Sequence, residues 1–260
     1  MSGGEVTRTY SVIGLPVSAV DYATAVAECQ RLARLPRATR VAASNTHIAV
    51  MAHEEADFGE TMRRFDLIVP DGMPLVWMMN AQGAGLRDRV YGPYLMREVI
   101  AASGRPWRHY FLGGTEECLE RLQVALREIQ PELEVAGAFS PPFAPLEEMD
   151  CEGMVARLEE ARADFIWVAF GGGKQERLIE RLAAASTRGC FLAVGDAFPL
   201  LAGMREFAPG WVQRLGLTWL WRVAQEPRRL LGRYLHCNGR FVALAVAEWW
   251  RGLRKGRVDA

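Results

Sequence analysis

Asp71 stands between a proline and a glycine at the end of the apolar run FDLIVPDG. These neighbours restrict the backbone, so the carboxylate belongs to the end of a strand and not to the exposed face of a helix. A carboxylate held in this way can act as a general base that takes a proton from an attacking hydroxyl. It can equally cap the helical segment MPLVWMMN that follows, and the local sequence leaves both roles open.

The segment WVAFGGGKQERLIERL, residues 167–182, contains a second candidate site. It is not a P-loop, because Lys174 is followed by Gln175 and no glycine stands five residues before Gly173. A dinucleotide-binding G-x-G-x-x-G is also absent, since position 176 is a glutamate. The segment predicts a strand that ends at the glycines and a helix that begins near Lys174, whose N-terminus favours anions. A plain strand-to-helix turn would explain the glycines but not the three polar residues after them.

Similar polar or glycine turns follow several other apolar runs. The turns are Ser44–His47, Pro70–Gly72, Gly113–Thr115, Gly171–Gly173 and Gly195–Asp196. In an open parallel sheet such turns gather along one edge, where ligands bind. His47 lies in one of them, but a single histidine is more often a local hydrogen-bonding residue, and no second histidine has a metal-ligand spacing.

Apolar runs alternate with amphipathic segments along most of the chain. Strands are expected in TYSVIGLPVS (a strand or a short hairpin), TRVAASNTHIAVMA, FDLIVPDG, WRHYFLGG, ELEVAGAFS, DFIWVAFGGG and GCFLAVGDAF. Nearly continuous apolar strands separated by helices indicate a parallel sheet that is covered on both faces. The expected fold is therefore α/β, with a Rossmann-like, mostly parallel sheet between helices, plus a basic C-terminal helical appendage.

The composition supports a packed core, since half of the 260 residues are apolar and 24% are charged. Five widely spaced cysteines without a CxxC pair argue against a zinc site or a disulfide framework and fit a reducing compartment. The first residues do not resemble a signal peptide, and every apolar stretch is shorter than the ~18–20 residues of a membrane span.

The charge is unevenly distributed along the chain. Residues 204–260 hold 11 Lys/Arg, 4 Asp/Glu and five of the eight tryptophans, whereas residues 1–203 hold 20 Lys/Arg and 27 Asp/Glu. We expect residues 1–203 to form the catalytic core and residues 204–260 to form the appendage. Arginines among tryptophans suggest a surface that docks on an anionic membrane. Nucleic acid is a poorer match, because this region has a single lysine and no recognisable module. An ordinary pair of terminal helices with solvated arginines is the alternative.

Several motifs, taken in order, resemble those of the WecG/TagA/CpsF glycosyltransferases. They are SNTHIAVMA, FDLIVPDGMPLVW, RVYGPYLM, YFLGG, FGGGKQERLIERL and AFPLLAGMREFAPGWVQRLGLTWLWRVAQEPRR. The resemblance covers about residues 8–235. It implies an enzyme that moves a sugar from a UDP-sugar to an undecaprenyl-diphosphate-linked saccharide. Such an enzyme would be cytoplasmic and peripheral on the inner face of the cytoplasmic membrane, in cell-surface or exopolysaccharide synthesis, where assembly partners are possible.

The resemblance also implies roles for positions of this chain. Asp71 matches the base that deprotonates the acceptor hydroxyl. The resemblance implies that the glycine turn lines the sugar-nucleotide pocket. Together with the turns described above, it gives the substrate-binding positions Asn45, His47, Arg89, Gly113, Gly114, Gly171, Gly173, Lys174, Gln175, Glu176 and Asp196. The acceptor diphosphate would meet Arg222, Arg228 and Arg229. No cofactor and no metal are expected, and the sequence has no D-x-D pair for a manganese ion.

Four positions depart from the family pattern. Ala43 replaces a threonine, whose role is lost unless Ser44 supplies it, and Tyr94 replaces an acidic residue. Pro199 replaces an aspartate, and Thr218 replaces a glutamate. These changes predict an altered donor or acceptor, or reduced activity. The alternative is a catalytically weak nucleotide-sugar-binding or scaffolding subunit of a polysaccharide assembly complex, whereas a nicotinamide-dependent oxidoreductase would need the missing glycine fingerprint.

Overall fold

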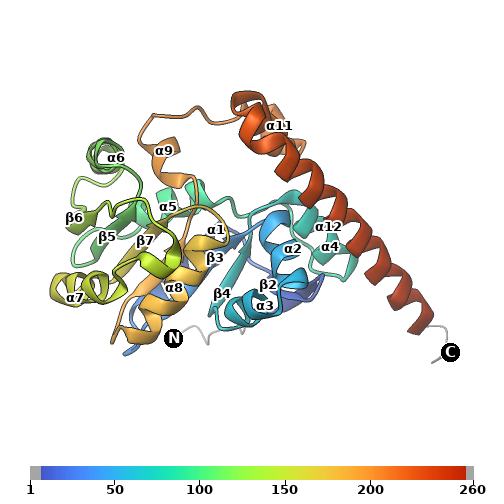
Figure 1. The fold of residues 1–260 in the computed structure, drawn as a ribbon, viewed down its shortest axis with the longest axis horizontal. Coiled ribbons are helices and arrows are strands. Elements are labelled where there is room, and N and C mark those ends of the chain that lie inside the picture. Colours follow the sequence, from blue (N-terminus) through green and yellow to red (C-terminus); the bar gives the residue numbers. More distant parts are fainter. Residues whose placement is uncertain (1–6, 256–260) are drawn as a thin grey trace.

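The computed structural model describes residues 7–255, with the side chains of residues 229, 233 and 251–255 excepted. A six-stranded sheet in which all neighbours are parallel forms its centre (Figure 1). From one edge to the other, the strands are β4 (Leu67–Pro70), β3 (Thr39–Ser44), β8 (Cys190–Ala193), β7 (Phe165–Ala169), β5 (Arg108–Gly113) and β6 (Glu134–Phe139). The expected N-terminal strand or hairpin is a hairpin, formed by antiparallel β1 (Thr9–Val12) and β2 (Leu15–Ser18).

Helices cover both faces of the sheet, as the apolar strands predict. One face packs on α2 (Thr46–Glu54), α3 (Ala56–Arg63), α7 (Cys151–Ala161) and α8 (Lys174–Ala185). The other face packs on α1 (Tyr22–Ala33), α5 (Gly92–Ala101), α6 (Glu116–Ile129) and α9 (Ala197–Leu201). In β7, for example, Ile166 and Val168 belong to the first core, and Phe165 and Trp167 belong to the second. The prediction of a Rossmann-like α/β fold is confirmed.

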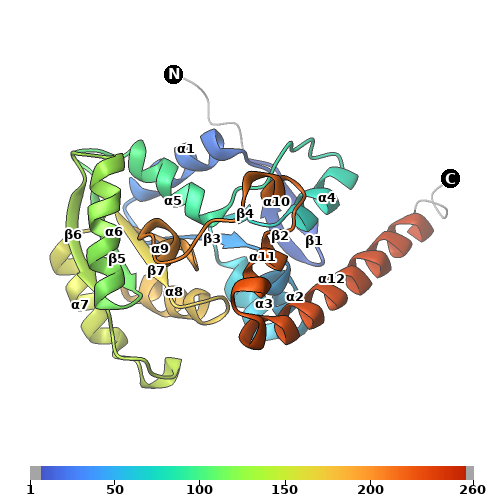
Figure 2. The same ribbon diagram turned by 90° about the horizontal axis from the view of Figure 1, so that it is seen from above.

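Three C-terminal helices lie over the carboxyl ends of the strands. They are α10 (Gly210–Arg214), α11 (Thr218–Gln225) and α12 (Pro227–Lys255). The first half of α12 packs on α2, while its second half extends away from the sheet (Figures 1 and 2). Across residues 7–255, no helix has the combination of length and apolar character that spanning a bilayer requires. The division between core and appendage at residue 203 stays a prediction.

A buried histidine in the second core makes the stability of the fold depend on pH. Nε2 of His109, in β5, donates to the carbonyl oxygen of Ser103 at 3.1 Å, and Nδ1 accepts from Nε1 of Trp167 at 3.2 Å. Since the indole N–H can only donate, Nδ1 carries no proton. Burial lowers the pKa of His109 to about 4.

We therefore expect His109 to destabilise the protein in acid. Between pH 6.5 and pH 4 the unfolded chain takes up a proton that the folded protein does not bind, which lowers the free energy of unfolding by about 2–3 kcal/mol. Urea unfolding at pH 7.5 and pH 4.5 should show a smaller acid effect in the His109→Gln variant than in the unmodified protein. The same pH dependence in both proteins would contradict this assignment.

Candidate active site

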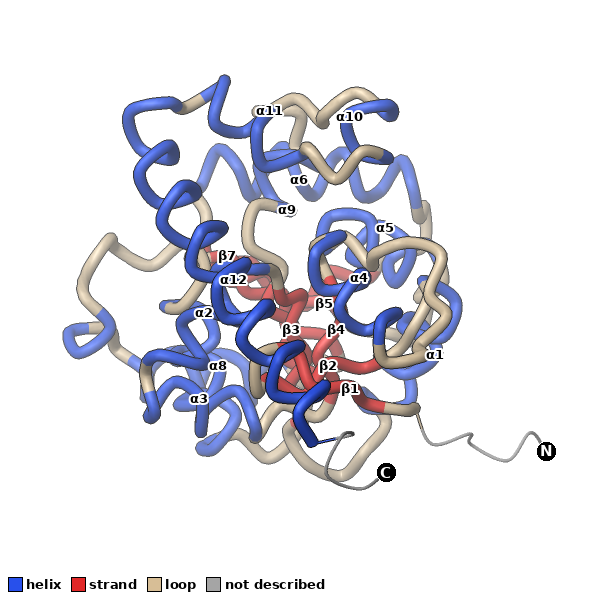
Figure 3. Tube along the Cα trace, turned by 90° about the vertical axis from the view of Figure 1, so that its right-hand side faces the viewer, coloured by secondary structure: helices blue, strands red, loops and turns tan. Residues whose placement is uncertain are grey.

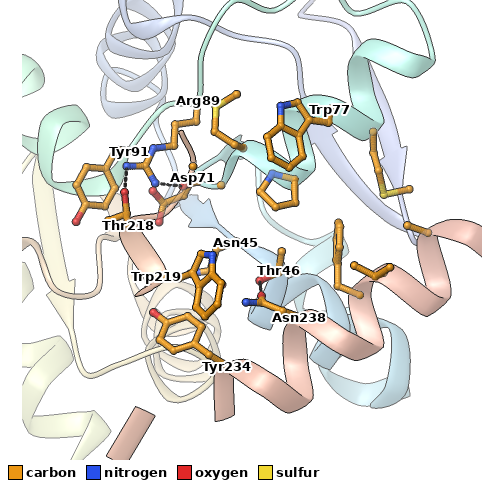
Figure 4. Close-up of a pocket in the computed structure, with 18 of the residues that line it drawn as sticks. Asn45, Thr46, Asp71, Trp77, Arg89, Tyr91, Thr218, Trp219, Tyr234 and Asn238 are labelled. Carbon is orange, nitrogen blue, oxygen red and sulfur yellow. Dashed lines mark hydrogen bonds between the residues drawn. The ribbon is translucent and has the colours of Figure 1, made fainter. Parts of the chain in front are cut away.

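Two pockets meet at the carboxyl ends of β3, β4 and β8, beneath the C-terminal helices. The larger pocket, of about 400 Å³, lies between α4 (Met73–Ala81), α11 and α12 (Figure 4). The smaller pocket, of about 100 Å³, lies over the glycine turn before α8 and over the turn that follows β8. Five residues line both pockets, namely Asn45, Asp71, Tyr91, Arg222 and Tyr234. The predicted base and one of the predicted acceptor arginines thus stand where the pockets join.

The end of β4 fixes Asp71 at this junction. Its backbone N–H donates to the carbonyl oxygen of Ser44 at 2.8 Å, and its Oδ1 accepts from the backbone N–H of Gly92 at 3.2 Å. The helix α4 begins after Gly72, and no side chain of the described residues caps it, so Asp71 is not the N-cap that the sequence allowed. Burial raises the pKa of Asp71 to about 7, against the lowering effect of the Arg89 charge. This carboxyl can therefore exchange a proton near neutral pH.

Arg89 is buried beside Asp71 and connects the core to α11. Its guanidinium donates to Oγ1 of Thr218 at 2.9 Å and to the carbonyl oxygen of Asp71 at 3.3 Å, and it lies 4.4 Å from the ring centre of Tyr91 (Figure 4). Thr218 stands where the family pattern has a glutamate. Its neutral hydroxyl accepts the hydrogen bond without cancelling the charge of Arg89, which stays available to an anion in the pocket.

Arg222 reaches the junction from α11 and forms an ion pair with Asp196. Arg205 forms ion pairs with Asp196 at 3.2 Å and with Glu226 at 2.7 Å, so it connects the two carboxylates. Burial opposes the charge of Arg222, but Asp196, Tyr234, Tyr91 and Asp71 together outweigh it and raise the pKa of the guanidinium. Asp196 lines the smaller pocket, as predicted, and it also holds α11 against the turn after β8.

Tyr94, which replaces the family's acidic residue, has a structural role in this chain. Its ring stacks on Phe207 with centroids 5.3 Å apart, and its hydroxyl accepts from Nε2 of Gln213 at 3.0 Å. These contacts attach residues 207–213 to α5.

The three polar residues after the glycine turn have different surroundings. Glu176 is fully buried and accepts from the N–H of Gly173 at 2.6 Å and from Nε2 of Gln175 at 3.0 Å. Oε1 of Gln175 accepts from the N–H of Gly195 at 3.2 Å, so these two side chains join the turns on either side of the smaller pocket. Burial raises the pKa of Glu176. Lys174 instead donates to the carbonyl oxygen of Ala144 and lines neither pocket.

We expect the Gln175→Ala variant to bind UDP about tenfold more weakly than the unmodified protein, because the two turns lose their connection. Its melting temperature should fall by roughly 2–6 °C. Lys174→Ala is the matched control from the same motif, and it should leave the affinity for UDP unchanged. Calorimetric titration with UDP decides between the outcomes, and an unaltered affinity in Gln175→Ala would place the donor elsewhere.

The structure brings several other predicted residues to the smaller pocket. Oδ1 of Asn45 caps α2 by accepting from the N–H groups of His47 at 3.0 Å and Ile48 at 3.3 Å. His47 lines the pocket with Nδ1 at 3.2 Å from Sγ of Cys237 in α12. Gly171 also lines it, with a φ of 84° and open space where a Cβ would lie.

Four further predicted residues, Gly113, Gly114, Gly173 and Arg228, line neither pocket. An added Cβ at Gly113 would be 2.5 Å from the carbonyl oxygen of Ala169, so this glycine permits close strand packing, and Gly114 follows it. Gly173 contributes its N–H to Glu176 and does not line the pocket. Arg228 is exposed on α12 and lines neither pocket. The side chain of Arg229 falls outside the described residues.

The structure shows whether the hydroxyl of Ser44 can replace the one that is missing at Ala43. Ala43 lines the smaller pocket, whereas Ser44 is fully buried and its hydroxyl has no hydrogen-bond partner among the described residues. Successive residues of a strand point to opposite faces of a sheet. Ser44 therefore does not supply the hydroxyl that is missing at Ala43. Pro199 lies in α9 and lines neither pocket.

Sequence reasoning missed the contribution of α12. Tyr234, Asn238 and Phe241 line the larger pocket, and Oγ1 of Thr46 donates to Oδ1 of Asn238 at 2.9 Å (Figure 4). Trp219 of α11 also lines it, with its ring centre 5.9 Å from that of Tyr234. The signal in the sequence was the helical spacing of these residues, which puts two polar groups on an otherwise apolar face.

Comparison with known proteins gives the site its context. Residues 10–255 match the model of the Glycosyl transferase WecG/TagA/CpsF family. The N-acetylglucosaminyldiphosphoundecaprenol N-acetyl-beta-D-mannosaminyltransferase of Bacillus subtilis (strain 168) is 24% identical over 186 residues, which is 71% of each chain. The family match includes every element that lines the two pockets. The chain therefore belongs to the WecG/TagA/CpsF family of glycosyltransferases.

Proposed function

We propose that this glycosyltransferase moves a sugar from a UDP-sugar to a saccharide carried on a polyprenyl diphosphate, with inversion at the anomeric carbon. The observation that carries the proposal is the position of Asp71 between a polar and an apolar pocket, with a pKa of about 7. The name of the Bacillus subtilis relative describes an acceptor of this chemical class.

The smaller pocket suits part of the donor. The N-termini of α2 and α8 line this pocket, and their dipoles favour the negative charge of a diphosphate. The pocket has a volume of about 100 Å³, so the rest of a sugar nucleotide would extend beyond it. Within residues 7–255, no cluster of His, Cys, Asp and Glu has the composition of a metal site. Transfer without a metal stays a prediction that an assay with a chelator tests.

The proposed reaction is a single displacement. Asp71 takes the proton of the acceptor hydroxyl, whose oxygen forms a bond to the anomeric carbon as the bond from that carbon to the UDP oxygen breaks. The electron pair of the broken bond leaves with UDP, and the N-termini of α2 and α8 beside the smaller pocket stabilise it. Arg222 lines both pockets at their junction, and there it can hold the diphosphate of the acceptor.

An assay for UDP release tests this function. Release should require both the donor and a saccharide on a polyprenyl diphosphate, and UDP-GlcNAc and UDP-ManNAc are the first donors to try. A scaffolding subunit would bind the UDP-sugar but would not cleave it, so no UDP would be released. Binding without release for every donor and acceptor pair would therefore favour the scaffold.

The C-terminal helices expose many apolar side chains. Their exposed apolar side chains include Trp211, Leu215, Leu220, Leu231, Leu235, Trp249 and Trp250. Arg228 and Arg229 lie on the same helix as the last four. Apolar side chains beside basic ones are typical of segments that bind anionic lipid surfaces. We propose that this surface docks the enzyme on the inner face of the cytoplasmic membrane.

Vesicles that contain anionic lipid should bind the protein at low salt and release it at high salt. Each basic residue near such a surface contributes ~1 kcal/mol, so the double variant Arg228→Glu/Arg229→Glu should bind at least about tenfold more weakly. Arg121→Glu/Arg127→Glu on α6 makes the same change of charge away from this surface and should bind normally. Sedimentation measures all three proteins. Binding that responds neither to salt nor to the first reversal would contradict membrane docking through this surface.

A further inference from the structure

The larger pocket changes character along its length. Its inner end is polar, with Asp71, Arg89 and Arg222 around it. Its outer part is a groove between α4 and α12, which lie next to each other in Figures 3 and 4. The groove is lined by Pro74, Trp77 and Met78 of α4 and by Phe241, Val242 and Val246 of α12. A ligand that fills the whole pocket must have a charged end and an apolar end.

The apolar part of this groove is open to solvent. Trp77 is 56% exposed, Val242 is 60% exposed and Val246 is 47% exposed. Thr46 and Asn238 interrupt the apolar lining, and Oγ1 of Thr46 donates a hydrogen bond of 2.9 Å to Oδ1 of Asn238. Contiguous exposed apolar side chains around a pocket are unfavourable in water and mark a site for an apolar ligand.

The groove is elongated and begins at the charged end. From Tyr234 at the junction to Val246 the helix α12 rises by ~18 Å, at 1.5 Å per residue. The same helix continues to Trp249 and Trp250, which are exposed and belong to the proposed membrane-docking surface. The groove therefore connects the charged end of the pocket with the surface at which a lipid chain would leave the protein.

We propose that the groove between α4 and α12 binds the first isoprene units of the acceptor's polyprenyl chain, while the diphosphate lies at Arg222. This inference rests on the proposed function and adds the part of the acceptor that the apolar residues recognise. The positive charge of Arg222 and Arg89 fixes the direction, since the anionic end must lie inside and the apolar chain must point outwards. The lipid then takes part in specificity, because a saccharide on a short or soluble diphosphate leaves the groove empty.

Three diphosphates of different chain length test the groove, each used below the concentration at which it forms micelles. They are geranylgeranyl diphosphate, dimethylallyl diphosphate and inorganic diphosphate, titrated by calorimetry into the full chain. Burial of the longer chain should make geranylgeranyl diphosphate bind at least about tenfold more tightly than dimethylallyl diphosphate. Equal affinities for the long and the short chain would overturn the proposal.

Tryptophan substitutions locate the binding. Val242→Trp places a bulky side chain in the groove. It should weaken the binding of geranylgeranyl diphosphate about tenfold without changing the affinity for dimethylallyl diphosphate. Val246→Trp, one turn further along, should have the same effect and keeps the test valid if the first variant folds poorly. Ala243→Trp is the matched control, because Ala243 is exposed on α12 and does not line the pocket. The proposal would be overturned if Ala243→Trp lost the same affinity for geranylgeranyl diphosphate. It would also be overturned if neither valine variant lost affinity.

The outcomes separate this inference from the proposed function. Normal transfer without dependence on chain length overturns the groove and leaves the glycosyltransferase reaction standing. The affinity could instead depend on chain length and lose this dependence in Val242→Trp, while the protein releases no UDP. That result would support the groove and contradict sugar transfer.

Discussion

The Asp71→Asn variant should transfer sugar about 10²–10⁴-fold more slowly than the unmodified enzyme, because the amide cannot accept the proton of the acceptor hydroxyl. The loss should appear in kcat and not in the affinity for UDP. In the unmodified enzyme, the rate should rise as the pH increases through about 7, where Asp71 loses its proton. Asp57→Asn removes an exposed carboxylate on α3 and should leave the rate unchanged.

The same variant should be more stable than the unmodified protein in alkaline solution. The folded state raises the pKa of Asp71 from 3.8 to about 7, so the carboxyl stabilises the fold below its unfolded pKa, and this contribution is lost as the pH rises through 7. Above pH 7 the ionised group is unfavourable, and Asn at this position should raise the free energy of unfolding by roughly 1–3 kcal/mol. Urea unfolding at pH 5 and pH 8.5 measures the difference. Full transfer activity in this variant would contradict the role of Asp71 as the base, and a loss of stability at pH 8.5 would contradict its raised pKa.

The kcat/KM of the Arg222→Ala variant should be about 10²–10³-fold lower than that of the unmodified enzyme, because a charged hydrogen-bond donor is removed from the junction of the two pockets. Most of the effect should appear in the KM for the acceptor, with a smaller effect on the affinity for UDP. Loss of the ion pair with Asp196 should also loosen the contact of α11 with the core, although Arg205 still reaches Asp196 at 3.2 Å.

Arg214→Ala controls for the loss of one positive charge from the C-terminal helices, because Arg214 is exposed at the end of α10. Its kinetic constants should be those of the unmodified enzyme. Arg222→Lys should recover part of the acceptor affinity, because the charge returns without the planar, bidentate geometry. A normal KM for the acceptor in Arg222→Ala would contradict its assignment to the acceptor side.

The local patterns that predicted the sheet also predicted the centre of the site. Apolar strands and glycine turns define where each β-strand stops, and parallel strands bring those ends together. For this reason Asn45, Asp71 and Gln175 could be placed at one edge from the sequence alone. The same logic placed Lys174 and Gly113 there, but periodicity does not say where a side chain points. Lys174 turns to the loop at Ala144.

The contribution of the C-terminal helices depends on contacts that no local pattern contains. Thr46 and Asn238 are 192 residues apart, yet their side chains share a hydrogen bond. The family resemblance assigned both Arg222 and Arg228 to the acceptor diphosphate, although one is largely buried against Asp196 and the other is exposed on the next helix. Only the packing of α11 and α12 over the sheet distinguishes them.

The anomeric configuration of the product tests most directly the claim that Asp71 acts as the base of a single displacement. The enzyme is incubated with a UDP-sugar and a saccharide on a short-chain polyprenyl diphosphate, and the new glycosidic bond is examined by NMR. One displacement with a base on the acceptor side inverts the configuration of the donor, whereas retention requires a second displacement through a covalent intermediate. The account predicts a product whose new linkage is inverted relative to the donor. A product with the donor's configuration would contradict it.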